Sequence, residues 1–302
     1  MFNRILVPLD GSEHAERICG CVIGFAKAIG ADVELFAVVG SVERAPRPGA
    51  AAGAEAAEGA IAQARRYLEH RVLTLDEAGV KATTNVVAGS PAEEIVKRAS
   101  SPDIDMIAMA TRRESALARG ILGSVTDRVL HSTPVPLLTI RPADAHGAFA
   151  KRGRPGTIVV PLDGSELGES AVPVSLFLAK ALEAEVLFLQ ALPPPYVAAG
   201  ELGVQFYASD YGISEEREQV LSYLARFVER ARSEGVEATP RAAVGSAAAC
   251  IIEAIESQAG ALVVMSTHGA SGFKRWIVGS VTDKVIRSSG RPVLVLPPKR
   301  TA

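Results

Sequence analysis

Short apolar runs alternate with amphipathic stretches along the second half of the chain. The runs are rich in β-branched residues and bounded by turn residues, as strands are, and they cover residues 157–162, 186–191, 238–244, 261–265 and 292–296. Between them, helical patterns cover residues 166–182, 214–234, 247–257 and 280–288. Strands that are apolar on both faces and alternate with helices predict a parallel sheet covered by helices on both sides.

The same order of elements appears in the first half of the chain. Its expected strands lie near residues 5–9, 33–39, 83–88, 104–110 and 136–140. Two motifs recur unchanged: Val-Pro-Leu-Asp-Gly-Ser-Glu at 7–13 returns at 160–166, and Gly-Ser-Val-Thr-Asp at 123–127 returns at 279–283. An internal duplication of this length predicts two α/β domains, each doubly wound around a five-stranded parallel sheet.

The expected boundaries follow from the positions of the repeats. The first domain is predicted at residues 1–142 and the second at residues 157–302. The segment 143–156 between them is rich in charged residues and glycine, which is typical of a linker.

A segment without clear period follows the second strand of each half. Residues 40–59 are rich in alanine, glycine and proline, and residues 193–212 begin with three prolines. Both are expected to be flexible excursions. Four aromatic residues in the later segment either pack it onto the sheet or help to cover a ligand: Tyr196, Phe206, Tyr207 and Tyr211.

Composition narrows the class of protein. With 48% hydrophobic residues, the 302-residue chain has enough apolar material for two packed cores. The net charge of -2, with acids and bases mixed along the chain, gives no reason to expect nucleic acid or an anionic membrane as a partner. The first apolar run is too short for a signal peptide, and no stretch approaches the roughly 20 apolar residues of a membrane span.

Three cysteines, an odd number, argue against a disulfide framework and for the reducing cytoplasm. Cys19 and Cys21 are two residues apart in a predicted helix and therefore point to different faces. A metal or redox role for this pair is not expected.

Candidate chemistry gathers where a doubly wound sheet binds its ligands, beyond the carboxyl ends of the strands at the point where strand order reverses. If the first strand of the second half is central, that point lies between its first and fourth strands. Asp163 ends the first of these, Ser-Thr-His-Gly at 266–269 follows the fourth, and Gly279 and Ser280 open the last helix. A helix start preceded by glycine offers free N–H groups and favours a phosphate.

These residues carry a resemblance to a known family. The spacing of a glycine, two residues, a glycine, nine residues, and glycine with serine or threonine is similar to that of the universal stress proteins. The second half supplies Ser266, Gly269, Gly279 and Ser280 in this pattern, with serine in place of the first glycine. Together with the Val-Pro-Leu-Asp-Gly-Ser motif, the resemblance to a tandem universal stress protein covers nearly all of both halves.

The resemblance implies a domain of strand order 3-2-1-4-5 that holds ATP across the switch point, with or without Mg²⁺. In the second half, Asp163 would approach the ribose or the region of phosphate and metal, and the backbone of Ala191 would meet adenine. Gly269, Gly279 and Ser280 would surround the phosphates. The other pocket residues implied are Pro161, Met265, Ser266, Val281 and, as a further phosphate donor, His268.

Each element of this site also has a plainer explanation. The Asp-Gly-Ser turn at 163–165 is typical of a strand-to-helix connection in which Asp or Ser caps the helix. Ser280 and Asp283 have the spacing of a capping box, and Lys274 and Arg275 are in a predicted loop, where such residues are usually solvated. The convergence of these features on one predicted crevice is what favours a ligand.

The first half keeps part of the pattern and loses the phosphate loop. Its matching residues are Pro8, Asp10, Val38, Gly123 and Ser124, whereas Ala110 replaces the first position and Arg113 replaces Gly269. Glycine permits a positive φ and a close approach of the backbone to phosphate, and arginine does not. Either the loop is blocked, or Arg112 and Arg113 bind an anion through their guanidinium groups.

The function that these observations favour is a cytoplasmic ATP-binding stress-response protein that acts as a sensor or switch. The chain lacks the Gly-x-x-x-x-Gly-Lys-Ser/Thr loop of P-loop enzymes, so any ATP hydrolysis is expected to be slow. Two alternatives remain open. One is an adenylating enzyme, although its Ser-Gly-Gly-x-Asp-Ser turn is missing, and the other is an interaction module without nucleotide.

The resemblance also implies a mode of association. Universal stress protein domains pair through their last strands, which here are predicted at residues 136–140 and 292–296. One chain would then be equivalent to a dimer, and association of two such chains into a homo-oligomer is expected because apolar edge strands favour pairing.

Overall fold

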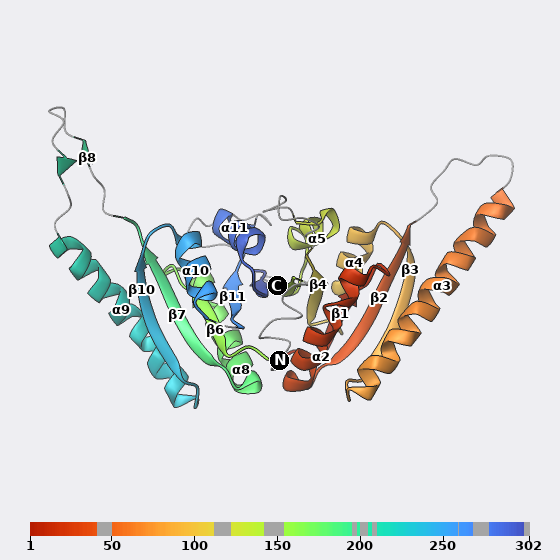
Figure 1. The fold of residues 1–302 in the computed structure, drawn as a ribbon, viewed down its shortest axis with the longest axis horizontal. Helices are drawn as coiled ribbons and strands as arrows, with labels where there is room; N and C mark the ends of the chain where they lie inside the picture. Colours follow the sequence, from red (N-terminus) through yellow and green to blue (C-terminus); the bar gives the residue numbers. More distant parts are fainter. Residues whose placement is uncertain are drawn as a thin grey trace.

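The structure is a computed structural model. It describes residues 1–40, 50–111, 122–141, 154–194, 198–199, 205–206, 210–258, 260–267 and 278–298. Figure 1 shows two similar halves that meet edge to edge, with helices on both sides of a continuous sheet. The strands predicted from the apolar runs are present in both halves.

Ten strands form the main sheet, in the order β10-β7-β6-β11-β12-β5-β4-β1-β2-β3. The strands of the first half are β1 (Arg4–Pro8), β2 (Asp32–Gly40), β3 (Ala82–Gly89), β4 (Met106–Ala110) and β5 (Leu137–Ile140). Those of the second half are β6 (Thr157–Pro161), β7 (Glu185–Leu192), β10 (Ala238–Val244), β11 (Leu262–Ser266) and β12 (Val293–Leu296). Each half is parallel within itself and has the order 3-2-1-4-5, which confirms the predicted fold class.

The two halves join through their last strands. β12 pairs antiparallel with β5, with Val293 opposite Thr139 and Val295 opposite Leu137. The Thr139 hydroxyl donates to the Val293 carbonyl at 3.1 Å. On one side of the sheet a second contact joins the halves, since the rings of Phe2 and Phe177 meet edge to face at 6.1 Å. The sheet is therefore continuous through the whole molecule rather than divided into two separate sheets.

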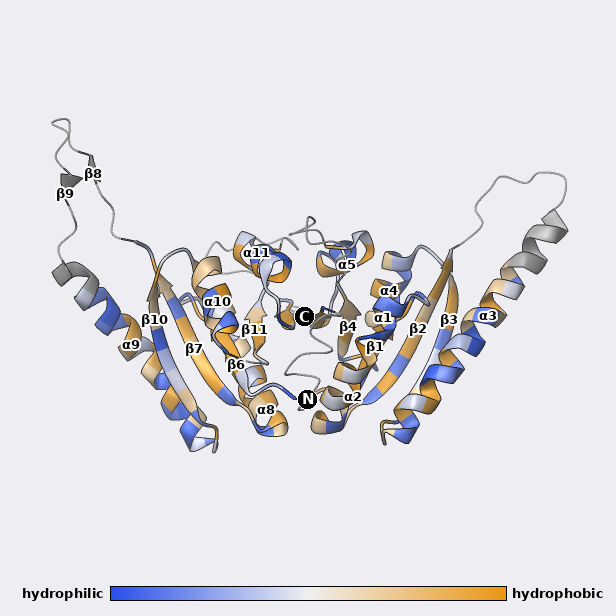
Figure 2. Cartoon of the chain, in the orientation of Figure 1, coloured by the Kyte–Doolittle hydropathy of each residue, from blue (hydrophilic) through white to orange (hydrophobic). Residues whose placement is uncertain are grey.

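Helices cover both faces of this sheet. One face carries α2 (Cys19–Ile29), α3 (Ala50–Glu77), α8 (Ala171–Leu182) and α9 (Asp210–Ser233), and the opposite face carries α4 (Pro91–Ala99), α5 (Ser124–Leu130), α10 (Ala247–Glu256) and α11 (Ser280–Ser288). Two short helices, α1 (Glu13–Glu16) and α7 (Glu166–Glu169), follow the first strand of each half. Figure 2 shows apolar strands in the middle of each half and polar residues along α3 and α9.

The strands are apolar on both faces because each face meets its own helical layer. In β1, Ile5 and Val7 belong to the core beneath α2, whereas Leu6 belongs to the core on the other face. All three side chains are buried. Successive side chains of a strand point to opposite faces, so burial on both sides requires a continuous apolar run.

The single helix expected at residues 166–182 is wrong. The structure has two helices, α7 and α8, which meet at Ser170. Pro173 lies in the first turn of α8 and has no N–H to donate, but the first half has the same break between α1 and α2 with Gly20 at the matching position. The break therefore belongs to the repeated element and does not depend on the proline.

The excursions are shorter and more regular than predicted. α3 begins at Ala50 within the segment 40–59, because its alanine-rich and glutamate-containing sequence favours helix. In the segment 193–212, β8 (Ala198–Ala199) and β9 (Gln205–Phe206) form an antiparallel pair, and α9 begins at Asp210. Of the four aromatic residues expected to pack or cover there, Phe206 lies in β9 and Tyr211 in α9, whereas Tyr196 and Tyr207 lie outside the described residues, as does most of the expected linker.

Among the helices that the structure describes, none has both the length and the apolar character needed to cross a membrane.

Candidate functional site

A cavity lies beyond the carboxyl ends of the first and fourth strands in each half, at the point where strand order reverses. In the second half these strands are β6 and β11, which pair as Ile158 with Leu262 and Val159 with Val263. The cavity above them has a volume of about 310 Å³, and its counterpart between β1 and β4 has about 250 Å³. Such a crevice is where a doubly wound sheet binds its ligands.

The second cavity brings together residues that lie far apart in the sequence. Eight of the ten predicted positions line it: Pro161, Asp163, Ala191, Met265, Ser266, Gly279, Ser280 and Val281. They come from the ends of β6, β7 and β11 and from the start of α11. The other two predicted residues, His268 and Gly269, lie outside the described residues.

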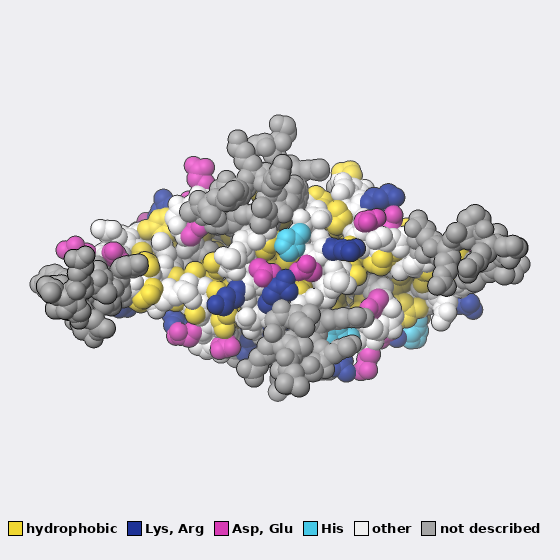
Figure 3. Space-filling model, turned by 90° about the horizontal axis from the view of Figure 1, so that it is seen from above, with side chains coloured by type: hydrophobic (Ala, Val, Ile, Leu, Met, Phe, Trp, Pro, Cys, Tyr) yellow, Lys and Arg dark blue, Asp and Glu magenta, His cyan; other side chains and the backbone are white. Residues whose placement is uncertain are grey.

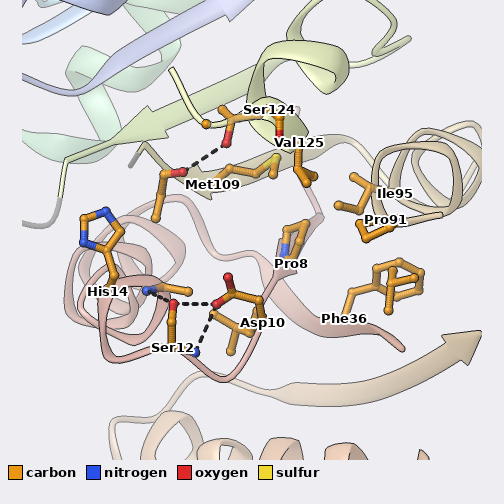
Figure 4. A pocket seen from close by; sticks show the side chains of 16 residues that line it. Pro8, Asp10, Ser12, His14, Phe36, Pro91, Ile95, Met109, Ser124 and Val125 are labelled. Atoms are coloured by element: carbon orange, nitrogen blue, oxygen red, sulfur yellow. Dashed lines mark hydrogen bonds between the residues drawn. The ribbon is translucent and has the colours of Figure 1, made fainter. Parts of the chain in front are cut away.

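The first cavity is built from the matching elements. Pro8, Asp10, Val38, Gly123 and Ser124 all line it, and Arg112 and Arg113 lie outside the described residues. Figure 4 shows Asp10 and Ser12 on one side of this cavity and the apolar residues Phe36, Pro91 and Ile95 on another. The cavity therefore has a polar end and an apolar end.

The Asp-Gly-Ser turn orients a carboxylate at the rim of each cavity. Oδ1 of Asp163 accepts from the Ser165 amide at 3.1 Å and from its hydroxyl at 2.6 Å. Oγ of Ser165 accepts from the Gly168 amide at 3.0 Å and thereby caps α7. Gly164 has φ of 82°, which favours glycine at this position. The turn interpretation and the site interpretation are thus compatible, because Ser165 caps the helix while Asp163 holds Ser165 and lines the cavity.

The capping-box interpretation of Ser280 is wrong. The N-cap of α11 is Gly279, without a side-chain cap, so Ser280 is already the first helical residue. A side chain at that position is past the point from which it reaches the N–H groups of the first turn. The Asp283 carboxylate instead accepts from Nε of Arg287 at 2.8 Å, one turn further along the helix. The Ser280 side chain lines the cavity.

A buried threonine fixes the start of α11 against the end of β11. Thr282 is 2% exposed, and its hydroxyl donates to the Ser266 carbonyl at 3.0 Å. The Gly279 amide donates to the Thr267 carbonyl at 2.7 Å. Sequence reasoning missed this contact, although the threonine belongs to the repeated Gly-Ser-Val-Thr-Asp motif. The helix start is therefore held rigidly beside the cavity.

Comparison with protein families decides the class of the chain. The model of the universal stress protein family matches residues 1–141 and again residues 155–297. The chain belongs to the universal stress protein family. The two matches are consistent with two universal stress protein domains in tandem, as the sequence resemblance predicts.

Individual relatives agree with this assignment. The universal stress protein YxiE of Bacillus subtilis is 31% identical over 143 residues, which are 46% of this chain and 97% of YxiE. The universal stress protein Rv2005c of Mycobacterium tuberculosis is 28% identical over 201 residues, or 65% of this chain and 62% of that protein. A crystal structure of a universal stress protein from Archaeoglobus fulgidus has the same fold, with a TM-score of 0.72 at 21% identity, over 98% of this chain and 99% of that one.

The two universal stress protein domains differ in the side chains at the apolar end of their cavities. The bulkier side chain stands in the first domain at three matched positions: Phe36 against Leu189, Val38 against Ala191, and Pro91 against Ala247. All three belong to the apolar end.

The second cavity offers one carboxylate to a metal ion, which fits Mg²⁺ bound together with a nucleotide. Asp163 is the one carboxylate among the described residues that line this cavity. Across the described part of the chain, no cluster of three or more His, Cys, Asp or Glu residues could hold a metal ion. Mg²⁺ commonly binds through one carboxylate, several waters and the phosphates of a nucleotide, and one carboxylate fits that mode.

Proposed function

We propose that the second universal stress protein domain binds ATP and that the protein acts as a cytoplasmic stress-response sensor or switch. The observation that carries the proposal is the position of Asp163 and Ser280 on the walls of one cavity at the reversal of strand order. A cavity with an apolar end, a carboxylate and a helix start has the groups that a nucleotide requires.

The residues that line the second cavity offer a suitable group to each part of a nucleotide. Pro161, Ala191 and Ile251 offer apolar surface to adenine, and Asp163 offers its carboxylate to ribose hydroxyls or, through Mg²⁺, to phosphate. The Ser280 hydroxyl and the first amides of α11 offer donors to the phosphates. His268 and Gly269 are proposed to complete the phosphate end.

A sensor role is favoured over catalysis by the residues that line the cavity. Asp163 is the one ionisable side chain among its described lining residues, so this part of the site offers no pair of general acid and base. ATP occupancy would therefore act by stabilising one conformation or one choice of partner. Hydrolysis, where it occurs, would be slow.

The proposal also covers the domain boundaries, the compartment and the association of the protein. We place the domains at residues 1–142 and 157–302, with a linker at 143–156, and regard the β5–β12 junction as an intramolecular counterpart of a dimer interface. The cytoplasmic location is part of the same proposal and is supported by the odd number of cysteines in the chain. Further association into a homo-oligomer is part of this proposal.

The decisive experiment is to denature freshly purified protein, identify any released nucleotide by chromatography, and titrate the nucleotide-free protein with ATP and Mg²⁺ by calorimetry. Gly269→Arg, which copies the first domain, is expected to abolish binding at the second cavity, whereas Arg113→Gly is the matched change in the first. Protein that carries no nucleotide and binds no added ATP would contradict the proposal. Unchanged binding in Gly269→Arg would contradict the phosphate-loop assignment alone.

A further inference from the structure

The helix α11 is anchored to its own domain at one end and to the first domain at the other. At its start, beside the second cavity, the Gly279 amide and the Thr282 hydroxyl donate to carbonyl groups at the end of β11. In its last turn, the Arg287 guanidinium contacts Asp127 of the first domain at 2.7 Å. The helix has nine residues and is about 13 Å long, so one short rigid element connects the cavity to the first domain.

A second residue of the first domain holds the same end of α11. Arg141, which follows β5, is 8% exposed, and its Nη2 donates to the Arg287 carbonyl at 2.8 Å and to the Ile286 carbonyl at 3.5 Å. The carbonyl groups of a last helical turn have no partner within the helix and form the negative end of the helix dipole. A buried guanidinium beside them therefore fixes this end of α11 to the first domain.

The duplication shows that these contacts are particular to α11. The residue of the first domain that matches Arg287 is His131, and its Nδ1 donates to the Asp127 carbonyl of its own helix at 2.8 Å. The residue that matches Arg141 is Pro297, whose side chain has no donor. Within the described residues, the first domain thus holds the end of α11, and the matched side chains do not hold α5 in the same way. Figure 1 shows α5 and α11 on either side of the junction between the halves.

This arrangement makes the position of one cavity wall depend on the other domain. The start of α11 brings Ser280 and the first-turn amides to the second cavity, so a ligand bound there needs the helix in one position. Contacts that fix the far end of the helix reduce the freedom that binding must remove. By linkage, a ligand that fixes α11 strengthens the contacts between α11 and the first domain by the same factor.

We infer that α11 couples occupancy of the second cavity to the packing of the two domains, and that Arg141 and Asp127 of the first domain are positioning residues for that site. The inference rests on the proposed function for the identity of the ligand. It adds the route by which binding in one domain changes the other, and it requires no ligand in the first cavity.

The test measures binding at the second cavity in variants that are changed only in the first domain. ATP with Mg²⁺ is titrated by calorimetry into Arg141→Ala, Asp127→Ala and the double variant, each on a Val38→Phe background that fills the first cavity. Arg141→Lys keeps a cation beside the last carbonyls of α11 and tests rescue. His131→Ala, which changes the α5 residue that matches Arg287, is the control.

We expect the Kd to rise about five-fold in Arg141→Ala, about two-fold in Asp127→Ala and about ten-fold in the double variant, as for other coupled sites. Arg141→Lys should recover most of the loss, and His131→Ala should bind as the background does. Reciprocally, nucleotide should slow hydrogen exchange of the amides in residues 124–141 by about three-fold or more, and the double variant should abolish this slowing.

A folded double variant that binds ATP within about two-fold of the background would overturn the inference. Exchange in residues 124–141 that does not respond to nucleotide would overturn it as well. Asp127→Ala keeps the test decisive if the loss of the buried Arg141 unfolds the protein, because Asp127 is partly exposed. A background protein that binds no ATP contradicts the proposed function itself, whereas normal binding without coupling contradicts this inference alone.

Discussion

Arg287 contacts Asp127 across the boundary between the two domains, with 2.7 Å between Nη2 and Oδ1. The same guanidinium holds Asp283 on its own helix, and these carboxylates raise its pKa, Asp283 more than Asp127. Figure 3, which looks onto the carboxyl ends of the strands, shows acidic and basic side chains together near the middle of this face. The helices that begin at Ser124 and Ser280 are thus joined by one ion-pair cluster.

The ion pair between the domains is expected to contribute little stability, because both side chains are partly exposed. A double-mutant cycle with Asp127→Ala and Arg287→Ala should give a coupling free energy of about 0.5–1 kcal/mol in urea unfolding. Arg141→Ala should cost more, about 2 kcal/mol, because Arg141 is buried and donates to the Arg287 carbonyl at 2.8 Å. Equal losses for the exposed pair and for Arg141 would contradict this ranking.

Ser280 and Ser165 are expected to separate ligand binding from helix capping. Ser280→Ala should weaken ATP binding by about three- to ten-fold and leave the free energy of unfolding nearly unchanged, because Ser280 is not a cap. Ser165→Ala should cost about 1 kcal/mol of stability, since its hydroxyl caps α7. Calorimetric titration and urea unfolding measure the two effects. Ser124→Ala is the matched control for nucleotide binding, and a large stability loss in Ser280→Ala would refute the assignment of Gly279 as the cap.

The buried carboxylate of Glu34 is expected to depend on Arg98. Glu34 is 4% exposed and accepts from Arg98 at 2.5 and 2.7 Å and from Asn85 at 3.1 Å. Arg98→Ala should therefore cost about 3 kcal/mol, because it leaves a buried charge without its main partner.

The second domain shows which residues can replace the pair of Glu34 and Arg98. Its matching residues are Leu187 and Ala254, so Glu34→Leu combined with Arg98→Ala should recover most of the stability lost in Arg98→Ala. Thermal and urea unfolding of the single and double variants test this. A double variant as unstable as Arg98→Ala would show that the network is not the cause of the loss.

Tyr223 is expected to make the second domain sensitive to alkali. Burial, together with the hydrogen bond of its hydroxyl to Glu169 at 3.0 Å, raises the pKa of Tyr223 to about 12. The unfolded state therefore releases this proton first, and the stability that Tyr223 contributes below pH 10 is lost as the pH rises toward 12.

Tyr223→Phe should cost about 1 kcal/mol at pH 7 and should flatten the fall in stability between pH 10 and pH 12. Urea unfolding at a series of pH values measures both effects. The first domain has the matching Tyr67, whose pKa burial also raises, so Tyr67→Phe is the parallel variant. An unchanged pH profile in Tyr223→Phe would assign the alkaline loss to other groups.

The strands could be predicted because each apolar run packs against a helical layer on both faces, whereas the order 3-2-1-4-5 was implied by the resemblance to universal stress proteins. Ile5 and Leu6 face opposite helical layers, and no amphipathic alternative satisfies that pattern. The break between α7 and α8 was not predicted, because the helical pattern of residues 166–182 continues through Ser170, and the same break between α1 and α2 has no proline to mark it. The helix that begins at Ala50 was not predicted, because residues 40–59 combine helix-breaking glycine and proline with helix-favouring alanine, and composition alone does not show where the helix begins.

Some residues of the candidate site could be predicted from the sequence, and others could not. Asp163 and Ser280 were found because turn residues after a strand and a glycine before a helix are local signals, and the repeat marked them twice. His14, which lines the first cavity, was not predicted. One histidine in a short helix gives no sequence signal for a site, and only folding brings its ring to the Thr111 carbonyl, 97 residues away in the sequence.

The sequence by itself determined the duplication, the parallel α/β class and the turn and helix-start motifs, because these depend on local composition and on the periodicity of burial. Pairing of the last strands was implied by the family resemblance, and the tertiary structure added the antiparallel register of β5 and β12. Only the tertiary structure decided that Gly279 rather than Ser280 caps its helix, and that matched carbonyls accept from His14 in one domain and from Gly279 in the other. Those choices depend on which donors and acceptors meet after packing, and residues distant in the chain compete for them.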